Sequence, residues 1–313
     1  MELSLTLVAA LAADAVLGEP RRRHPLALFG QCAERLEARL NRGRRGDGVL
    51  ALLLLVTPPV LIAAILGAVL PAIAAWALAG LLLMVAVGRA GLIEHAEAVA
   101  RPLAAGDVER ARRRVAWLVS RDTERLDAAG VRIALLESVL ENASDAVFGS
   151  MCWFVFGGVA AGPAGAAAAV VAHRLVNTLD AMWGYRTPRF ARFGWAAARL
   201  DDGMNWPAAR LTALLFALVG DTHTALVCWR EQARRWSSPN AGPVMAAGAG
   251  ALGIRLGGGA WYHGTWRERP ALGGRRWPDD ADVIRALGLT DRALAVVVVA
   301  VLVVVLIAGG GHA

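Results

Sequence analysis

The sequence predicts an all-α, polytopic integral membrane protein, and three observations lead to this fold class. The 313 residues are 57% hydrophobic and 19% charged, with a mean hydropathy of +0.47, which is too apolar for an ordinary soluble domain. Long apolar runs alternate with arginine-rich segments, as in chains that cross a bilayer several times. Proline and glycine break some of these runs, which predicts re-entrant or broken helices beside the transmembrane ones.

Basic charge is supplied by arginine alone, because all 33 basic residues are arginine and the chain has no lysine. This excludes a Walker-type phosphate lysine, a Schiff-base lysine and a catalytic lysine. Any phosphate-binding site must therefore use arginine, backbone amides or a metal. The net charge of +7 does not indicate nucleic acid, because the arginines flank apolar spans and form no compact basic module with interleaved aromatics. Lipid headgroups and polyanionic substrates are the expected partners.

The N-terminal part, residues 1–48, is predicted to hold one retained helix and an arginine-rich loop. The helix lies in or near the membrane, since its sequence has no basic n-region and contains Asp14, unlike a signal peptide. Residues 49–88 are expected to form a transmembrane hairpin that turns near Gly67 to Pro71. At about 1.5 Å per residue, this run is long enough to cross a core of roughly 30 Å twice.

Two crossings return the chain to the side of Arg21 to Arg23, which the positive-inside bias places in the cytoplasm. Residues 89–146 are polar and are expected to form cytoplasmic helices. Residues 147–230 are expected to form broken membrane helices and site loops, because Gly162-Pro163 splits the apolar run that begins there. One full crossing would place the arginines that follow outside, whereas a re-entrant element would return them to the cytoplasm.

The C-terminal part is predicted to be a polar loop, residues 231–291, followed by a transmembrane helix, residues 292–309. The helix is expected because the run is rich in β-branched residues and nearly free of charge. Glycines 257 to 259 follow no convincing strand and do not form a P-loop, so we do not expect that run alone to bind a nucleotide. The predicted organisation is a single membrane domain over residues 1–313.

Three polar clusters beside the apolar runs are the candidate functional residues. Glu137, Glu141 and Asp145 are spaced at i, i+4 and i+8, and at about 100° per residue they share one helical face. The second cluster runs from Asn177 to Arg186 and the third from Arg199 to Pro207. Polar side chains at this density are costly beside membrane-grade hydrophobicity unless they serve a site.

Each cluster also has a structural alternative. The acidic face of the first could be the solvated side of a cytoplasmic helix, paired with Arg132 or other residues. Asp202 could be a helix N-cap with Pro207 near the first turn, and the second cluster could form a cap or turn. His24, before a proline, is as consistent with a structural turn as with substrate contact.

Short motifs along most of the chain resemble the CbiB/CobD family of cobalamin biosynthesis. In order they are Asp14, Gly18, Pro20, His24 and Pro25; Val87-Gly88-Arg89; Arg121-Asp122-Thr123; Glu137-Ser138-Val139; Glu141-Asn142; Ser144-Asp145; Asn177-Thr178-Leu179-Asp180; Gly184-Tyr185-Arg186; Phe193-Gly194-Trp195; Ala198-Arg199-Leu200-Asp201-Asp202; Asn205; Pro207-Ala208; Arg210-Leu211-Thr212; Pro239-Asn240-Ala241-Gly242; and Leu256-Gly257-Gly258. The chain departs from the family pattern at Glu19, Ala146, Ser150 and Pro243.

The resemblance implies a multi-pass enzyme of the inner membrane whose site faces the cytoplasm. It implies that adenosylcobyric acid is joined to aminopropanol or its O-phosphate as an amide, with ATP and Mg²⁺. The catalytic candidates are Glu137, Glu141, Asp145 and Asp180, of which the first three are also the metal candidates. The candidates for binding substrate or ATP are His24, Arg121, Asp122, Asn142, Asn177, Tyr185, Arg186, Arg199, Asp201, Asp202, Asn205 and Asn240.

The residues fit that chemistry in outline. Making an amide from a carboxylate requires activation, most simply as an acyl phosphate, and therefore oxygen ligands for Mg²⁺, phosphate clamps and a base. Arg121, Arg186 and Arg199 are the candidate clamps. A carboxylate whose neighbours raise its pKa could take the amine proton, and the sequence does not say which one does.

A second hypothesis is a non-catalytic membrane sensor or transport component, because the family is distantly similar to a membrane protein of β-lactamase induction. A ligase must place carboxylates and arginines around one substrate, whereas a sensor tolerates scattered acids. The surplus of arginine favours the phosphorylated amine. The small residues of the hairpin could pack against a second protomer, and association with later membrane enzymes of cobalamin assembly is a further possibility.

Overall fold

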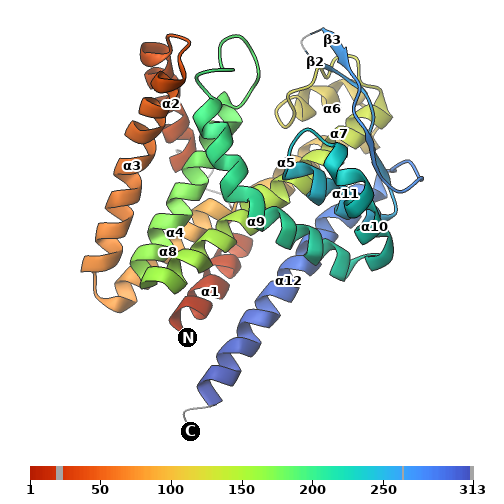
Figure 1. Ribbon diagram of the computed structural model, residues 1–313. Helices are drawn as coiled ribbons and strands as arrows, with labels where there is room; N and C mark the ends of the chain where they lie inside the picture. Colours follow the sequence, from red (N-terminus) through yellow and green to blue (C-terminus); the bar gives the residue numbers. More distant parts are fainter. Residues whose placement is uncertain (19–23, 263, 311–313) are drawn as a thin grey trace. The chain divides into compact units, whose positions relative to one another are not determined.

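The computed structural model describes residues 1–18, 24–262 and 264–310. The chain is mostly helical, which confirms the predicted all-α class (Figure 1). The expectations for Glu19, Pro20 and the arginines 21 to 23 lie outside the described residues.

Helices and short strands follow one another along the chain. They are α1 (Glu2–Leu17), α2 (Pro25–Leu40), α3 (Arg45–Val69), α4 (Ala72–Val87), α5 (Arg89–Ala104), α6 (Val108–Val115), α7 (Ala128–Asn142), the π-helix η1 (Ala143–Phe148), α8 (Gly149–Trp183), α9 (Trp195–Val219), α10 (Thr222–Gln232), the 3₁₀-helix η2 (Ala233–Arg235), α11 (Ala241–Leu252), β1 (Arg255–Gly257), β2 (Ala260–Tyr262), β3 (Thr265–Arg267), β4 (Ala271–Gly273) and α12 (Ala281–Gly310).

The protein is a multi-pass membrane protein. Within the described ranges, four helical segments are long and apolar enough to cross a membrane: Arg45–Val69, Ala72–Ala104, Ala128–Trp183 and Ala281–Val304. The first two contain the predicted hairpin, whose helices α3 and α4 are joined at Leu70 and Pro71. The last contains the start of the predicted C-terminal apolar run.

The chain forms two compact units, which are described separately. The first unit comprises residues 1–88, 145–205 and 304–313, and the second comprises residues 89–144 and 206–303. In the first unit, α3 and α4 both pack against α8. Its hydrophobic core joins α3 to the end of α8 and includes the fully buried Leu179, Trp183 and Phe193.

The broken apolar element is a helical hairpin. α8 loses helical geometry at Ala161 (φ −149°, ψ 31°) and Gly162 (φ 60°, ψ −148°), at the predicted break. A positive φ of this kind is readily adopted by glycine. Gly157 and Gly165 meet so closely that a Cβ on either would overlap the carbonyl oxygen of the other. Ser150 and His173 face each other farther along, so the two arms run antiparallel.

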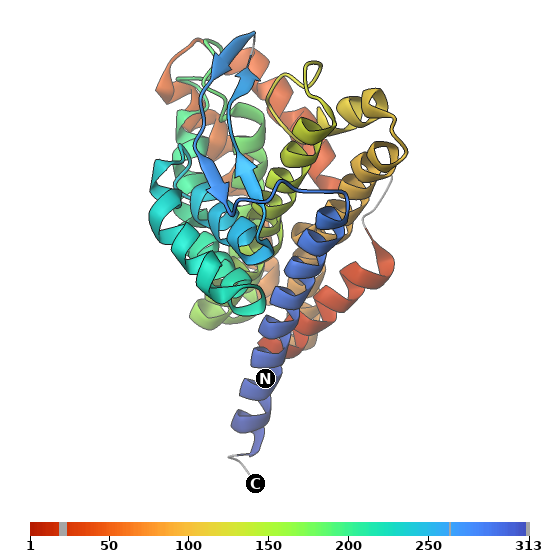
Figure 2. The ribbon, with the colours of Figure 1, turned by 90° about the vertical axis from the view of Figure 1, so that its right-hand side faces the viewer.

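The second unit corrects the prediction of a polar loop over residues 231–291. This segment contains α11, whose twelve residues are all buried, and two antiparallel strand pairs, β1 with β4 and β2 with β3. β4 packs against both α10 and α11, and the β1–β4 pair lies beside these helices (Figure 2). Alanine and glycine make α11 narrow enough to be enclosed, although it is too short to cross a bilayer.

Candidate functional site

The second and third polar clusters meet in the first unit. The Nδ2 atoms of Asn177 and Asn205 donate to the same oxygen of Asp201, at 3.2 and 2.9 Å. Arg174 Nη1 donates to Asn177 Oδ1 at 3.1 Å and fixes the orientation of that amide. Asn177 therefore bridges α8 and α9, which contradicts the reading of this residue as a simple cap or turn.

A buried histidine extends this network into the helical hairpin. His173 is fully buried, and its Nε2 lies 2.9 Å from Asn205 Oδ1. Since the amide nitrogen of Asn205 donates to Asp201, its oxygen is the acceptor, and a neutral His173 carries its proton on Nε2. His173 Nδ1 lies 3.4 Å from Ser150 Oγ. A continuous polar chain thus leads from Ser150 through His173 and Asn205 to Asp201.

Sequence reasoning missed His173 and Ser150. A single histidine in an alanine and valine run carries no spacing signal, and Ser150 was noted only as a departure from the family pattern. The available signal was the cost of burying a polar side chain, which applies to His173 as it does to the residues of the three clusters.

The environment of Asp201 makes it a candidate base. The carboxylate is 7% exposed, and burial raises the pKa of Asp201 to about 6, although hydrogen bonds from Asn177 and Asn205 oppose the shift. Burial also raises the pKa of Asp202, against the positive charges of Arg199 and Arg186. Asp201 and Asp202 lie inside α9, which begins at Trp195, so the N-cap alternative for Asp202 is wrong.

Other predicted residues of the first unit differ in burial and in the contacts that they make. Asp180 is half-buried near the end of α8. The pKa of Tyr185 is raised mainly by the burial of its own side chain, and the negative charge of Asp180 adds to this shift. Arg186 and Arg199 are exposed, and Arg199 Nη1 lies 3.8 Å from Asp202 Oδ2. His24 is the N-cap of α2, where its Nδ1 accepts the Leu26 N–H at 3.2 Å, which supports the structural alternative for this residue.

The first polar cluster has a different character, because Glu137 lies in a buried clamp of the second unit. The carboxylate is 3% exposed and pairs with Arg121 and Arg269, whose side chains are 8% and 12% exposed. Arg269 Nη1 and Nη2 lie 3.1 and 3.2 Å from its two oxygens. The backbone N–H of Gly257 donates to Oε1 at 2.9 Å. Glu137 thereby fixes the segment between β1 and β4 against α7.

This clamp differs from the predicted roles of its members. Both oxygens of Glu137 accept hydrogen bonds from protein donors, which does not fit a magnesium ligand. Arg121 pairs with Glu137, although its buried Nε has no hydrogen-bond partner among the residues that the structure describes. Glu137 is paired with Arg121 and Arg269, which are arginines other than Arg132, and Arg132 pairs with Asp280.

Helix geometry also changes within the first cluster. α7 ends at Asn142 and the π-helix η1 covers Asp145, so the spacing of about 100° per residue does not extend to that residue. Glu141 is half-buried, and exposed Asn142 donates to the Ser138 carbonyl oxygen at 2.8 Å. Among the described residues, no group of three or more acidic, histidine or cysteine side chains is arranged to hold a metal ion. The metal roles of Glu141 and Asp145 stay predictions.

Two further candidates have structural partners in the second unit. Asp122 accepts the backbone N–H of Gly264 through Oδ2 at 2.8 Å, and its own N–H donates to the Trp261 carbonyl oxygen. It thereby holds the β2–β3 pair. Asn240 Oδ1 accepts from Arg210 Nη1 at 2.8 Å at the start of α11.

These features define the class of protein: a multi-pass helical membrane protein with a buried polar network between a broken helical hairpin and a neighbouring helix. The CobD/Cbib protein family matches residues 7–290, and the chain belongs to that family. The chain is 53% identical over 293 residues to the cobalamin biosynthesis protein CobD of Stutzerimonas stutzeri (strain A1501), which covers 92% of this chain and 93% of the relative.

Other relatives are similar over nearly the same length. The cobalamin biosynthesis protein CobD of Chromobacterium violaceum is 48% identical over 313 residues, covering 94% of each chain. That of Mycobacterium tuberculosis (strain CDC 1551 / Oshkosh) is 42% identical over 290 residues, covering 88% of each. No solved structure matches. The family and the relatives support a role as a biosynthetic enzyme of cobalamin formation.

Proposed function

We propose that this protein forms an amide between adenosylcobyric acid and aminopropanol or aminopropanol O-phosphate at the expense of ATP. The reaction would take place at the cytoplasmic face of the inner membrane. Membership of the CobD/Cbib family supports the pathway, and the buried environment of Asp201 is the observation that carries the chemical step.

The amine must lose a proton before it can attack. An alkyl ammonium has a pKa near that of lysine, about 10.4, so it arrives protonated at neutral pH. A base works best when its pKa lies near the working pH, and the pKa of about 6 places Asp201 in that range. Asn177 and Asn205 hold the Asp201 carboxylate in one orientation through the hydrogen bonds described above.

The atoms balance if the substrate carboxylate is first phosphorylated. A carboxylate oxygen attacks the γ-phosphorus of ATP, which releases ADP and leaves an acyl phosphate. The amine nitrogen then forms a bond to the acyl carbon, the carbon–oxygen bond to phosphate breaks, and the phosphate leaves as hydrogen phosphate with the second proton that the nitrogen loses. Asp201 takes the ammonium proton and later passes it to water.

The arginines of this cluster suit a phosphorylated substrate. Arg186 and Arg199 are exposed, so their guanidinium groups are accessible to phosphate oxygens. Mg²⁺ is usually held by one or two carboxylates together with substrate phosphates, and would neutralise charge on the transferred phosphoryl group. Asp180 and Asp202 are half-buried carboxylates of the first unit that fit this role, as does the predicted ligand Asp145.

The test is turnover by the purified, detergent-solubilised protein. Adenosylcobyric acid and Mg-ATP are supplied with either amine, and the amide is detected by mass spectrometry. We expect product from wild type and from Glu97→Gln, whose carboxylate pairs with Arg101 on the surface of α5. Asp201→Asn should remain folded and lose turnover. Folded wild type that binds the corrinoid but forms no amide with either amine would overturn the proposal and favour the sensor or transport hypothesis.

A further inference from the structure

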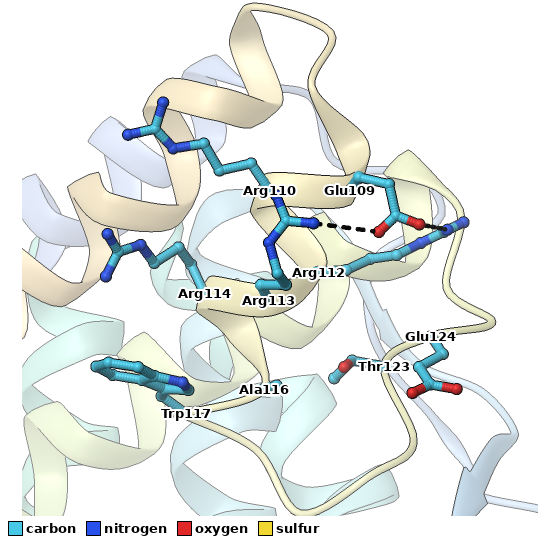
Figure 3. A pocket seen from close by; sticks show the side chains of 9 residues that line it. All are labelled: Glu109, Arg110, Arg112, Arg113, Arg114, Ala116, Trp117, Thr123 and Glu124. Atoms are coloured by element: carbon cyan, nitrogen blue, oxygen red, sulfur yellow. Dashed lines mark hydrogen bonds and ion pairs between the residues drawn. The ribbon is translucent and has the colours of Figure 1, made fainter.

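A cavity of about 890 Å³ lies in the second unit, beside α6 (Figure 3). α6 and residues 116–124 supply its lining, which includes four arginines and two glutamates. A cavity of this volume is within the usual range for small-molecule sites. The excess of guanidinium groups favours an anionic ligand.

The arginines of this pocket fall into two pairs. Arg112 and Arg113 both pair with Glu109, at 3.3 and 3.8 Å. Arg112 Nε also donates to the Leu126 carbonyl oxygen at 2.5 Å, which ties α6 to the segment before α7. These two arginines maintain the shape of the pocket and share the negative charge of one carboxylate.

Arg110 and Arg114 form the second pair. They are spaced at i, i+4, so they lie one above the other on the helix surface. Both are exposed, and within the described part of the chain neither forms an ion pair with a carboxylate. Figure 3 shows both side chains extending to the same side of the pocket as Trp117. Two adjacent guanidinium groups can together donate to the oxygens of one phosphate.

Trp117 gives this pair an aromatic neighbour. Its side chain is 75% exposed, and the Arg114 guanidinium carbon lies 5.6 Å from the ring centroid. Exposing a ring of this size forgoes a large gain from burial. A membrane-surface helix would present several apolar residues outward, but in α6 Ala111 and Val115 are fully buried. The polar outer face argues for a soluble ligand.

We propose that this pocket binds a soluble phosphate ester that carries a flat ring, of the class of nucleoside phosphates. Arg110 and Arg114 bind the phosphate, and the ring lies on Trp117. All of these residues belong to the second unit, and the site does not depend on the polar network that carries the proposed function.

The experiment uses the full chain in phosphatidylcholine nanodiscs, without Mg²⁺ or corrinoid. Binding of AMP, inorganic phosphate and adenosine is measured by isothermal titration calorimetry. We expect AMP to bind more tightly than either fragment. Arg110→Gln with Arg114→Gln should weaken AMP binding at least tenfold. The control, Arg101→Gln with Arg292→Gln, removes the same charge from exposed sites outside the pocket and should leave binding within twofold.

A third variant separates ring binding from charge. Trp117→Leu should weaken AMP binding and leave inorganic phosphate binding unchanged. The proposal fails if folded wild type does not bind AMP at millimolar concentration, or if the control pair loses as much affinity as the pocket pair. It also fails if native mass spectrometry shows that Arg110 and Arg114 retain phosphatidylglycerol while AMP does not bind, because the ligand would then be a lipid headgroup.

Discussion

Replacement of Glu137 by glutamine tests whether this residue is a structural clamp or a catalytic carboxylate. The side chain accepts from Arg121, from both terminal nitrogens of Arg269 and from the Gly257 N–H. Glutamine keeps the shape but turns an NH₂ group toward a guanidinium and leaves two buried positive charges without a counterion. Breaking a buried ion pair in this way costs about 3–5 kcal/mol.

A surface ion pair of the same unit gives the matched control. Arg132 Nη2 lies 2.6 Å from Asp280 Oδ1, but the Asp280 side chain is 50% exposed. Exposed pairs contribute about 0–1 kcal/mol because water screens them, so Asp280→Asn should change stability little. The stability losses of Glu137→Gln and Asp280→Asn should therefore differ by at least ~2 kcal/mol, which corresponds to a difference of about 4–8 °C between their unfolding midpoints for a unit of this size.

The assay is thermal unfolding in mild detergent, followed by circular dichroism at one scan rate for wild type and both variants. Adding Arg269→Gln to Glu137→Gln should recover part of the loss, because it removes one of the uncompensated charges. An equal midpoint for Glu137→Gln and Asp280→Asn would refute the clamp. Full stability together with lost turnover would restore the catalytic role for Glu137.

Three further predictions concern the first unit. Burial raises the pKa of Asp201 from 3.8 to about 6, so between these pH values the folded state keeps a proton that the unfolded state releases. The free energy of unfolding should therefore fall as the pH rises from about 4 to about 6. Asp201→Asn should flatten this part of the pH profile of the unfolding midpoint. Gly157→Leu should lower the midpoint sharply because its Cβ meets the Gly165 carbonyl, whereas Gly203→Ala, with open space around it, should not; equal midpoints would contradict the tight hairpin. His24→Ala should cost about 0.5–2 kcal/mol and His24→Asn much less, with turnover kept in both, since asparagine also caps helices; loss of turnover in His24→Asn would indicate substrate contact.

Hydropathy and helix breakers predicted the elements that are long or sharply interrupted. The α3–α4 hairpin and the break at Gly162 both carry signals within about 40 residues of sequence. α11 was missed because its apolar run is short and flanked by polar residues, so a reading tuned to spans of about 20 residues passes over it. The strand pairs were missed because each strand has only three residues, too few to show an alternating pattern.

The candidate site was predicted where its members lie on adjacent polar stretches. A ligase site was expected to gather carboxylates and arginines around one substrate, and the hydrogen bond of Asn177 with Asp201 brings the second and third polar clusters together. The pairing of Glu137 with Arg269 could not be predicted because the two residues are 132 apart in the chain, and spacing along one helix cannot reveal so distant a pair. The π-helix at residues 143–148 likewise follows from no pattern in the sequence and alters the helical phase assumed for Asp145.

The enclosure of α11 has a consequence for how this region tolerates change. Two of its glycines lie against backbone: a Cβ at Gly250 would lie 2.8 Å from Ala225 Cα, and one at Gly242 would lie 2.6 Å from the Ala233 carbonyl oxygen. Backbone atoms cannot move aside as a flexible side chain can. The space for a side chain, and not its polarity, therefore restricts which residues fit at these positions. Even alanine should be destabilising there. A saturation library of residues 241–252 should show depletion that follows side-chain size.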